Sequence, residues 1–219
     1  MLRANLEREI RRLEQDVLAM GEMVEKALLD SVNALKTRDF ERSEQIIEND
    51  REVNRRRFEI ESDILTLIAT QQPVAIDLRT LAAMLEIITE LERIGDYAKG
   101  VGKISLMIGD TPLLKPLLDI PIMAEKACNA LNRALRAFIA RDVETARAIP
   151  QEDDEVDALY DQVARELITY IISDPRNIEQ ANLLVWVAHN LERAADRVTN
   201  ICERVVFTVT GVMTELDSH

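Results

Sequence analysis

The sequence is poor in residues that interrupt regular structure. Its 219 residues include only 6 glycines and 6 prolines, about half the usual share of each. Aromatic residues make up 4% of the chain, so a core has to be built from aliphatic side chains. Together these shortages predict long, uninterrupted elements around an aliphatic core.

Cysteine and histidine are also scarce. Cys128 and Cys202 lie far apart and outside any Cys-x-x-Cys motif. This argues against a disulfide scaffold, and we expect two core thiols in a reducing, cytosolic compartment. The histidines are His189 and the terminal His219, and no Glu-x-x-His motif occurs. We interpret His189 as a surface or packing residue.

Long apolar runs are missing as well. The sequence contains no stretch of about 18 apolar residues, which is the length needed to cross a membrane. Residues 1–12 are charged, unlike a secretory signal. The net charge of -13 argues against a general nucleic-acid binder, because a polyanion requires a basic surface. It is compatible with cations, with basic partners, or simply with solubility.

Apolar residues recur at the steps of three and four that are typical of helices. Asp39 is placed to cap a second helix over about residues 40–69, and Gln72 before Pro73 ends that helix. The first segment carries Leu6, Ile10, Leu13, Val17, Met20, Val24, Leu28 and Leu35. The second uses Ile46, Ile47, Val53, Phe58, Ile60, Ile64 and Leu67. The third uses Leu78, Leu81, Leu85, Ile88, Leu91, Ala98, Val101 and Ile104.

The pattern then recurs after a break rich in proline and leucine, with leucines that need cover. Matching features are 100 to 103 residues apart: Asp39 and Asp142, Asp50–Asn54 and Asp153–Asp157, Pro73 and Pro175, Leu91–Asp96 and Leu191–Asp196. A repeat of this length indicates two copies of one supersecondary unit. The sequence therefore predicts an all-α fold of two antiparallel three-helix bundles, over residues 1–109 and 122–219, joined by a connector at 110–121. Pro150 should kink or delay the fifth helix.

Acidic residues recur in pairs four positions apart, which places each pair on one helical face. Glu92 lies beside Ile88 and Gly95, so its pair flanks the packed interface between helices. The candidate metal ligands are Asp50, Asn54, Glu92 and Asp96 in the first half and Asp153, Asp157, Glu192 and Asp196 in the second.

Clustered carboxylates require a counter-charge. Two of them about 4 Å apart repel by about 4 kcal/mol at an effective dielectric near 20. Oxygen ligands favour Mg²⁺, Ca²⁺, Mn²⁺ or iron over a structural zinc. Asp157 stands where the first half has neutral Asn54, so we expect the second site to bind cations more tightly. The competing interpretation is a solvated acidic face.

These repeated motifs, together with Gln72–Pro73, Asp77–Arg79 and Met20–Val24, resemble the PhoU family over nearly the whole chain. The resemblance implies pseudo-twofold symmetry, bound metal ions and a cytoplasmic homo-oligomer such as a dimer. It also implies an adaptor between the phosphate ABC transporter, through its ATPase subunit, and a sensor histidine kinase. Such an adaptor represses the phosphate-starvation response, reaches the membrane only through partners and has no catalytic residue. Asn54 and the pair Ala194–Ala195 depart from the family's motifs.

Two other functions are weighed against this one. The first is a carboxylate-bridged metal oxidase or hydrolase, which the shortage of nitrogen ligands disfavours. The second is a purely structural scaffold with unfilled acidic grooves. We also expect Trp186 in the core and interpret Arg55–Arg57 as a solvated face.

Overall fold

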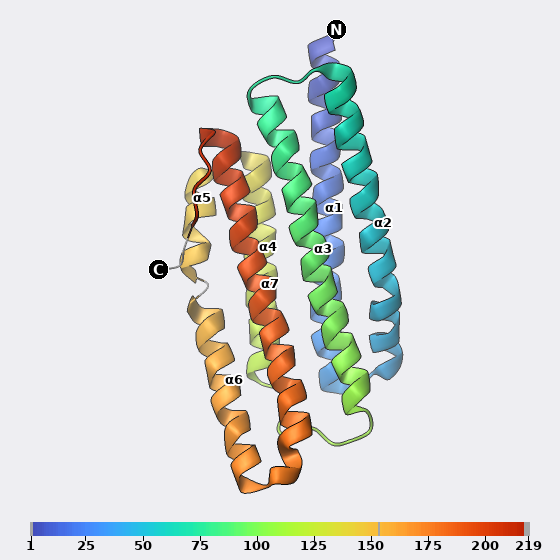
Figure 1. Ribbon diagram of the computed structural model, residues 1–219, viewed down its shortest axis with the longest axis vertical. Coiled ribbons are helices and arrows are strands. Elements are labelled where there is room, and N and C mark those ends of the chain that lie inside the picture. Colours follow the sequence, from blue (N-terminus) through green and yellow to red (C-terminus); the bar gives the residue numbers. More distant parts are fainter. Residues whose placement is uncertain (1, 153, 217–219) are drawn as a thin grey trace.

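Long helices make up the molecule. The computed structural model describes residues 2–152 and 154–216, and that part of the chain contains helices and no strand. The helices are α1 (Leu2–Thr37), α2 (Phe40–Gln71), α3 (Ile76–Ile108), α4 (Asp119–Ala140), α5 (Val143–Ala148), α6 (Asp154–Ser173) and α7 (Ile178–Thr210), with 3₁₀ turns at Pro150–Glu152 and Pro175–Asn177. The longest, α1, has 36 residues and so spans about 54 Å. The elongated shape in Figure 1 follows from these lengths.

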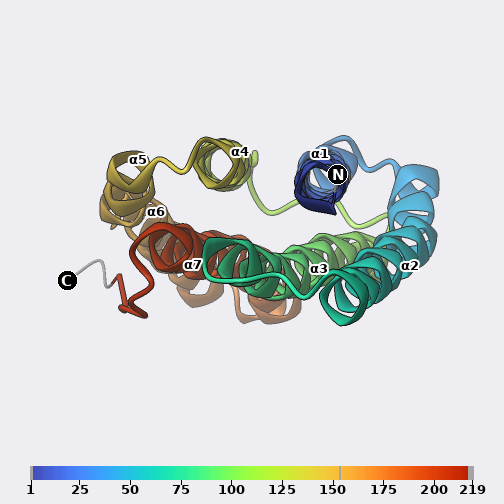
Figure 2. The same ribbon diagram turned by 90° about the horizontal axis from the view of Figure 1, so that it is seen from above.

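The helices form two similar halves. α1, α2 and α3 build the first, and α4, α5 with α6, and α7 build the second (Figure 1). Seen from above, α1 and α4 lie side by side in one layer and α3 and α7 in the other, with α2 and α5–α6 at opposite edges (Figure 2). The expected fold class, two antiparallel three-helix bundles, is confirmed.

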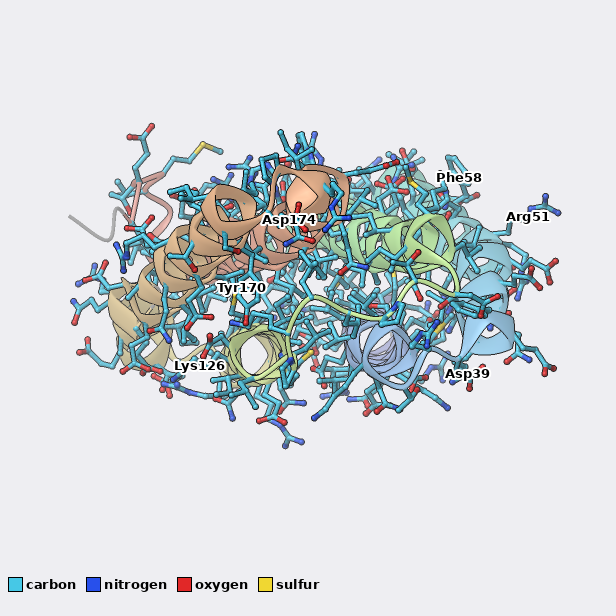
Figure 3. All side chains as sticks on the ribbon, turned by 90° about the horizontal axis from the view of Figure 1, so that it is seen from below. Asp39, Arg51, Phe58, Lys126, Tyr170 and Asp174 are labelled. Atoms are coloured by element: carbon cyan, nitrogen blue, oxygen red, sulfur yellow. The ribbon has the colours of Figure 1, made fainter. Side chains whose placement is uncertain are left out.

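Capping residues explain where the helices begin. The Asp39 carboxylate accepts a hydrogen bond from the Arg42 backbone N–H at 2.9 Å. Asp142 caps α5 in the same way, through the Thr145 N–H at 3.0 Å. Asp174 accepts from the N–H of Arg176 at 3.0 Å at the start of the last 3₁₀ turn. Asp39 and Asp174 both lie at the lower end of the molecule (Figure 3). The repeat thus includes the turns as well as the helices.

Pro150 divides the helix that is continuous in the first half. α5 ends at Ala148, a 3₁₀ turn covers Pro150–Glu152, and α6 begins at Asp154. Proline lacks an N–H and its ring clashes with the preceding turn, so a helix cannot run through it unbroken. The predicted disturbance of the fifth helix is confirmed.

Aliphatic side chains fill the core, as expected. Every apolar residue predicted for the seam of α1 is buried. Three expectations are wrong: Phe58 is 59% exposed, Leu78 is 43% exposed and Trp186 is 58% exposed. Phe58 lies five residues after the buried Val53, so it projects from another side of α2. It packs against the Arg57 guanidinium on the outer edge of the bundle (Figure 3).

The connector between the halves is held against the second half. The Gln180 side chain accepts a hydrogen bond from the Leu114 N–H at 2.7 Å and donates one to the Pro112 carbonyl at 3.0 Å. Leu117 is buried, and Leu113 and Leu114 are partly buried, which confirms the expected cover. Leu118 is 67% exposed, so for this leucine the expectation is wrong.

Candidate metal-binding grooves

A groove of about 300 Å³ opens beside α2 in the first half. α1 contributes Met23, Lys26, Ala27 and Asp30, α2 contributes Arg42, Ile46, Asn49, Asp50, Glu52 and Val53, and α3 contributes Gly95. Apolar side chains and charged groups of both signs line it. Asp50 is the one predicted ligand that lines this groove.

Asp50 is a buried carboxylate whose neighbours come from both α2 and α3. Its side chain is 5% exposed. The Asn54 amide donates to Asp50 Oδ2 at 3.2 Å, and the Lys99 ammonium donates to the same oxygen at 2.7 Å. Lys99 Nζ also lies 3.5 Å from Asp96 Oδ1. Two of the four predicted first-half ligands therefore contact one lysine, and Asn54 is joined to them through Asp50.

Glu92 joins this group through electrostatics. Burial raises the pKa of its carboxyl above the ordinary value, and repulsion from Asp96 and then Asp50 adds to the shift, while Arg57 opposes it. A carboxylate responds in this way when other negative charges are near. The convergence of acids from α2 and α3 that the repeat predicts is thus present in the first half.

Gly95 allows the two helices to come close at this point. A Cβ atom at this position would lie 3.4 Å from Val53 Cγ1 and 3.9 Å from Asp50 Oδ1. These are ordinary van der Waals distances, so the side chains of Val53 and Asp50 pack directly against the α3 backbone at Gly95.

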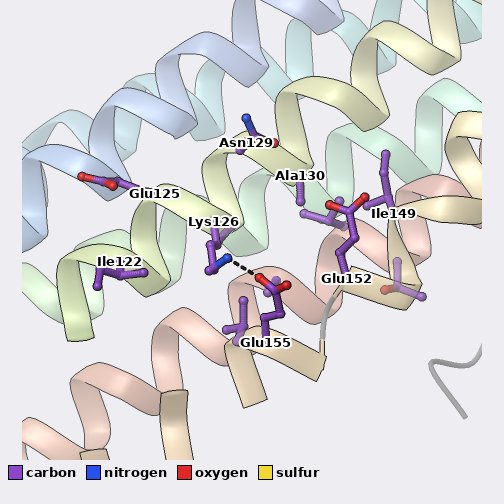
Figure 4. Close-up of a pocket in the computed structure, with 13 residues that line it drawn as sticks. Ile122, Glu125, Lys126, Asn129, Ala130, Ile149, Glu152 and Glu155 are labelled. Atoms are coloured by element: carbon purple, nitrogen blue, oxygen red, sulfur yellow. Dashed lines mark hydrogen bonds and ion pairs between the residues drawn. The ribbon is translucent and has the colours of Figure 1, made fainter. Parts of the chain in front are cut away.

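A second groove, of about 320 Å³, opens at the corresponding place in the second half (Figure 4). Lys126 on α4 forms an ion pair with Glu155 on α6 across it. Arg133 donates to Glu152 at 2.5 and 2.9 Å. The lining residues are Ile122, Glu125, Lys126, Ala127, Asn129, Ala130, Ile149, Glu152, Glu155, Val156, Ala195, Val198 and Thr199.

The two grooves are equivalent under the internal repeat. The spacing of 103 residues between the early helices and of 100 between the last helices relates their linings position by position. Matched pairs are Ala27 with Ala130, Ile46 with Ile149, Glu52 with Glu155, Val53 with Val156, and Gly95 with Ala195. The charged side chains differ, because the second groove has Lys126 at the position where the first has Met23.

The second set of predicted ligands is only partly described. Asp153 lies outside the described residues. Asp157 stands in the first turn of α6, and Asp196 accepts a hydrogen bond from Arg193, on its own helix, at 2.6 Å. Glu192 Oε2 lies 3.3 Å from His189 Nδ1.

His189 also packs against aromatic rings. Its ring centroid lies 5.4 Å from that of Trp186, edge to face, and 6.2 Å from that of Tyr160. This environment agrees with the interpretation of His189 as a packing residue. Trp186, which we expected in the core, instead lies exposed on the surface, where it contacts His189.

The predicted ligands can now be compared with what a metal ion requires. Within residues 2–152 and 154–216, no three side chains of Asp, Glu, His or Cys are arranged to hold a metal. In the first half, where all four predicted ligands are described, the Lys99 ammonium lies between Asp50 and Asp96. The first quartet therefore does not fit a metal in this arrangement. A site formed with Asp153 stays a prediction.

Sequence reasoning missed Lys99, which has the closest contact with the buried Asp50. The signal was available in the repeat, because Lys99 follows Asp96 by three residues and the equivalent position after Asp196 holds Thr199. In the basic run, Arg56 and Arg57 are half-buried and Arg56 pairs with Asp16 of α1 at 2.5 Å, so the expected solvated face holds for Arg55 alone. Arg55 pairs with Glu59 at 2.5 Å on the exposed face of α2.

The fold and grooves define a class: an elongated helical scaffold of two equivalent three-helix units, each with a groove lined by apolar and charged side chains. No helix within the described residues is both long and apolar enough to cross a membrane. The family model described as the PhoU domain matches residues 17–105 and again 120–205. The chain belongs to the PhoU family.

Relatives and solved structures agree with this assignment. The chain is 33% identical over 218 residues to a phosphate-specific transport system accessory protein PhoU homolog of Clostridium acetobutylicum, covering 99% of this chain and 100% of that protein. It is 36% identical over 211 residues to the protein of that name in Deinococcus radiodurans, covering 96% and 99%.

Two crystal structures match the fold. The phosphate transport system regulatory protein PhoU of Streptococcus pneumoniae superimposes with a TM-score of 0.88 at 29% identity, covering 95% of this chain and 99% of that one. PhoU of Pseudomonas aeruginosa gives a TM-score of 0.88 at 31% identity, covering 94% and 99%.

Proposed function

We propose that this chain is a cytoplasmic accessory protein of phosphate transport that regulates phosphate uptake and phosphate-starvation signalling. The observation that carries the proposal is the match to family members along nearly the full length of both chains, with both copies of the repeat included. The relatives' names describe accessory and regulatory proteins. A role as an adaptor without catalysis is consistent with those names.

The partners we propose are the ATPase subunit of a phosphate ABC transporter and a phosphate-sensing histidine kinase. The chain reaches the membrane only through them and acts as a homodimer. A net charge of -13 favours basic partner surfaces, since complementary charge speeds and orients association. Bound to both, the chain would repress the starvation response while phosphate is plentiful.

We further propose that the second half binds a hard cation, one of Mg²⁺, Mn²⁺, Ca²⁺ or iron. Its ligands would be Asp153, Asp157, Glu192 and Asp196, all of them oxygen donors, which suit such ions. The cation would tie α6 to α7 and fix the groove that a partner contacts. The described arrangement supports this only through the equivalence of the two grooves and the nearness of acids in the first.

Binding to purified partners tests the adaptor role. The chain should bind the transporter ATPase and the cytoplasmic part of the kinase, and chelation should weaken that binding. Glu192→Ala should weaken it similarly, whereas Glu86→Ala, an exposed acid of α3, should leave it unchanged. If neither partner binds, the adaptor role is wrong; if chelated protein binds equally well, the metal has no part in it.

Metal titration distinguishes the two halves. Asp196→Ala should weaken cation binding measured by calorimetry, because it removes a carboxylate from the second quartet. Asp96→Ala should have little effect, because its partner Lys99 already supplies positive charge in the first half. An equal or larger loss from Asp96→Ala would contradict the expected difference.

A further inference from the structure

The first half contains a cation of its own at the place where its predicted ligands meet. Lys99 is on α3, yet its ammonium is closest to Asp50 on α2, at 2.7 Å. The same ammonium lies 3.5 Å from Asp96. It therefore bridges carboxylates of two helices, which is the role assigned to a metal ion in the proposed second-half site.

We propose that the Lys99 ammonium is a tethered substitute for a metal ion, so that the first half is held together without metal. This inference stands on the contacts of Lys99 alone, and the comparison with the second half rests on the proposed cation site there.

Burial explains why a permanent cation is needed beside Asp50. The Asp50 side chain is 5% exposed, and a buried carboxylate without a counter-ion is strongly unfavourable. Asn54 supplies a hydrogen bond but no charge. Lysine carries a compact charge with three donors on a flexible stem, and this one is itself 28% exposed. Lys99 thus neutralises a group that solvent cannot reach.

Comparison of the repeats shows that this lysine is particular to the first half. The position 100 residues later holds Thr199, which lines the second groove. Glu92 and Asp96 correspond to Glu192 and Asp196 at the same spacing. In sequence, the first half thus has three carboxylates and a lysine where the second has four carboxylates and a threonine.

Other cations also act on these acids. Arg57 and Arg93 act on Glu92 in the first half. In the second half, Arg193 pairs with Asp196 along the surface of α7. Lys126 pairs with Glu155, which is outside the quartet. Among these contacts, Lys99 alone joins carboxylates of two neighbouring helices.

A reciprocal exchange of residues tests the inference in the full-length protein. Lys99→Thr gives the first half the residue of the second, and it is made in an Asp196→Ala background to silence the proposed second site. In EDTA its midpoint of thermal unfolding should fall by several degrees, and Mn²⁺ should restore it. Adding Asp50→Asn should abolish that recovery. Lys103→Thr, at an exposed lysine of α3, is the matched control. It should change neither the unfolding midpoint in EDTA nor the response to Mn²⁺.

The opposite exchange is Thr199→Lys in the otherwise unchanged chain. It should lower the Mn²⁺ stoichiometry and remove the effect of EDTA on thermal unfolding. The inference is overturned if Lys99→Thr is as stable in EDTA as its Lys103→Thr control, or if Mn²⁺ does not restore it. It is also overturned if Thr199→Lys keeps both the metal and the response to EDTA. If the unchanged chain binds no Mn²⁺, the second-half site fails, while recovery of Lys99→Thr still supports the role of Lys99.

Discussion

Cys128 on α4 and Cys202 on α7 behave as core residues. Both are buried thiols without a disulfide, and burial raises the pKa of each to about 12. The Sγ of Cys128 donates a weak hydrogen bond to the Glu25 carbonyl of α1, so this thiol also contacts the other half. The expectation that both cysteines fill the core is confirmed.

We expect both thiols to resist alkylation in the folded protein. A pKa about three units above the ordinary 9.0 lowers the thiolate fraction at pH 8 by about a thousandfold, and the thiolate is the reactive form. Iodoacetamide labelling followed by mass spectrometry should therefore be slow in native buffer and rapid in guanidinium. Rapid labelling of either cysteine in native buffer would contradict this.

The same shifts have a consequence for alkaline stability. The folded state holds these protons more tightly than the unfolded state, so the thiols' stabilising contribution is full below pH 9. It is lost as the pH rises from 9 toward 12. This follows from a pKa that is raised in the folded state, and it places the loss in the alkaline range only.

At the scale of helices, α2 and α3 approach closely at Gly102. A Cβ atom there would lie 3.2 Å from the backbone carbonyl of Ser43, which cannot rotate away. Nearby, the Ser43 and Ser105 hydroxyls form a buried hydrogen bond of 3.1 Å. At Gly100 the nearest atom is Asn190 Nδ2, at 2.8 Å, the end of a flexible side chain.

These surroundings predict opposite effects for two alanine substitutions. Gly100→Ala should raise the free energy of unfolding by up to about 1 kcal/mol, because alanine favours a helix and the Asn190 amide can move. Gly102→Ala should lose that gain, and Gly102→Val should cost about 1–3 kcal/mol by forcing the helices apart. Urea denaturation measures both, and equal stabilisation by the two alanines would contradict the close approach.

Much of the helical layout could be predicted because its causes are local. The caps at Asp39 and Asp142, the end of α2 before Pro73 and the break at Pro150 depend on neighbouring residues in sequence. The exposure of Phe58 depends on which side of α2 its neighbours cover. Spacing along one helix does not specify that, so the error arose where packing decides.

The site shows the same division between local and tertiary information. The repeat predicted that Asp50, Glu92 and Asp96 would meet; in the first half Asp50 and Asp96 share Lys99, and Glu92 is linked to them by electrostatic repulsion. It did not predict that a lysine would neutralise these acids. Whether Lys99 on α3 contacts Asp50 on α2 depends on how the two helices are aligned. The metal ligands of the second half stay a prediction.

At the scale of the whole molecule, the halves are joined by long helix contacts and specific polar bonds. α3 packs along α7, and α1 along α4 (Figure 2). Arg141, at the end of α4, pairs with the buried Glu14 of α1 at 2.6 Å. The Asn132 amide of α4 donates to the Glu25 carboxylate at 3.3 Å. The connector is therefore one of several links between the halves.

We expect the two halves to stay together after the connector is cut. A protease site inserted between the exposed Asp110 and Thr111 should be cleavable under native conditions. The cut chain should still elute from a sizing column at the volume of the uncut insertion variant, because the apolar face between the halves remains buried. Elution as two separate fragments would contradict this and would show that 1–109 and 122–219 are independent domains.

The contact between α3 and α7 also bears on how such a chain could arise. A gene encoding one repeat would produce a subunit whose apolar inner face could be covered only by a second copy, and its stability would depend on protein concentration. Fusing two copies through a short tether makes that pairing intramolecular. Duplication then frees each copy to diverge, so that one keeps a lysine and the other a threonine at the same place.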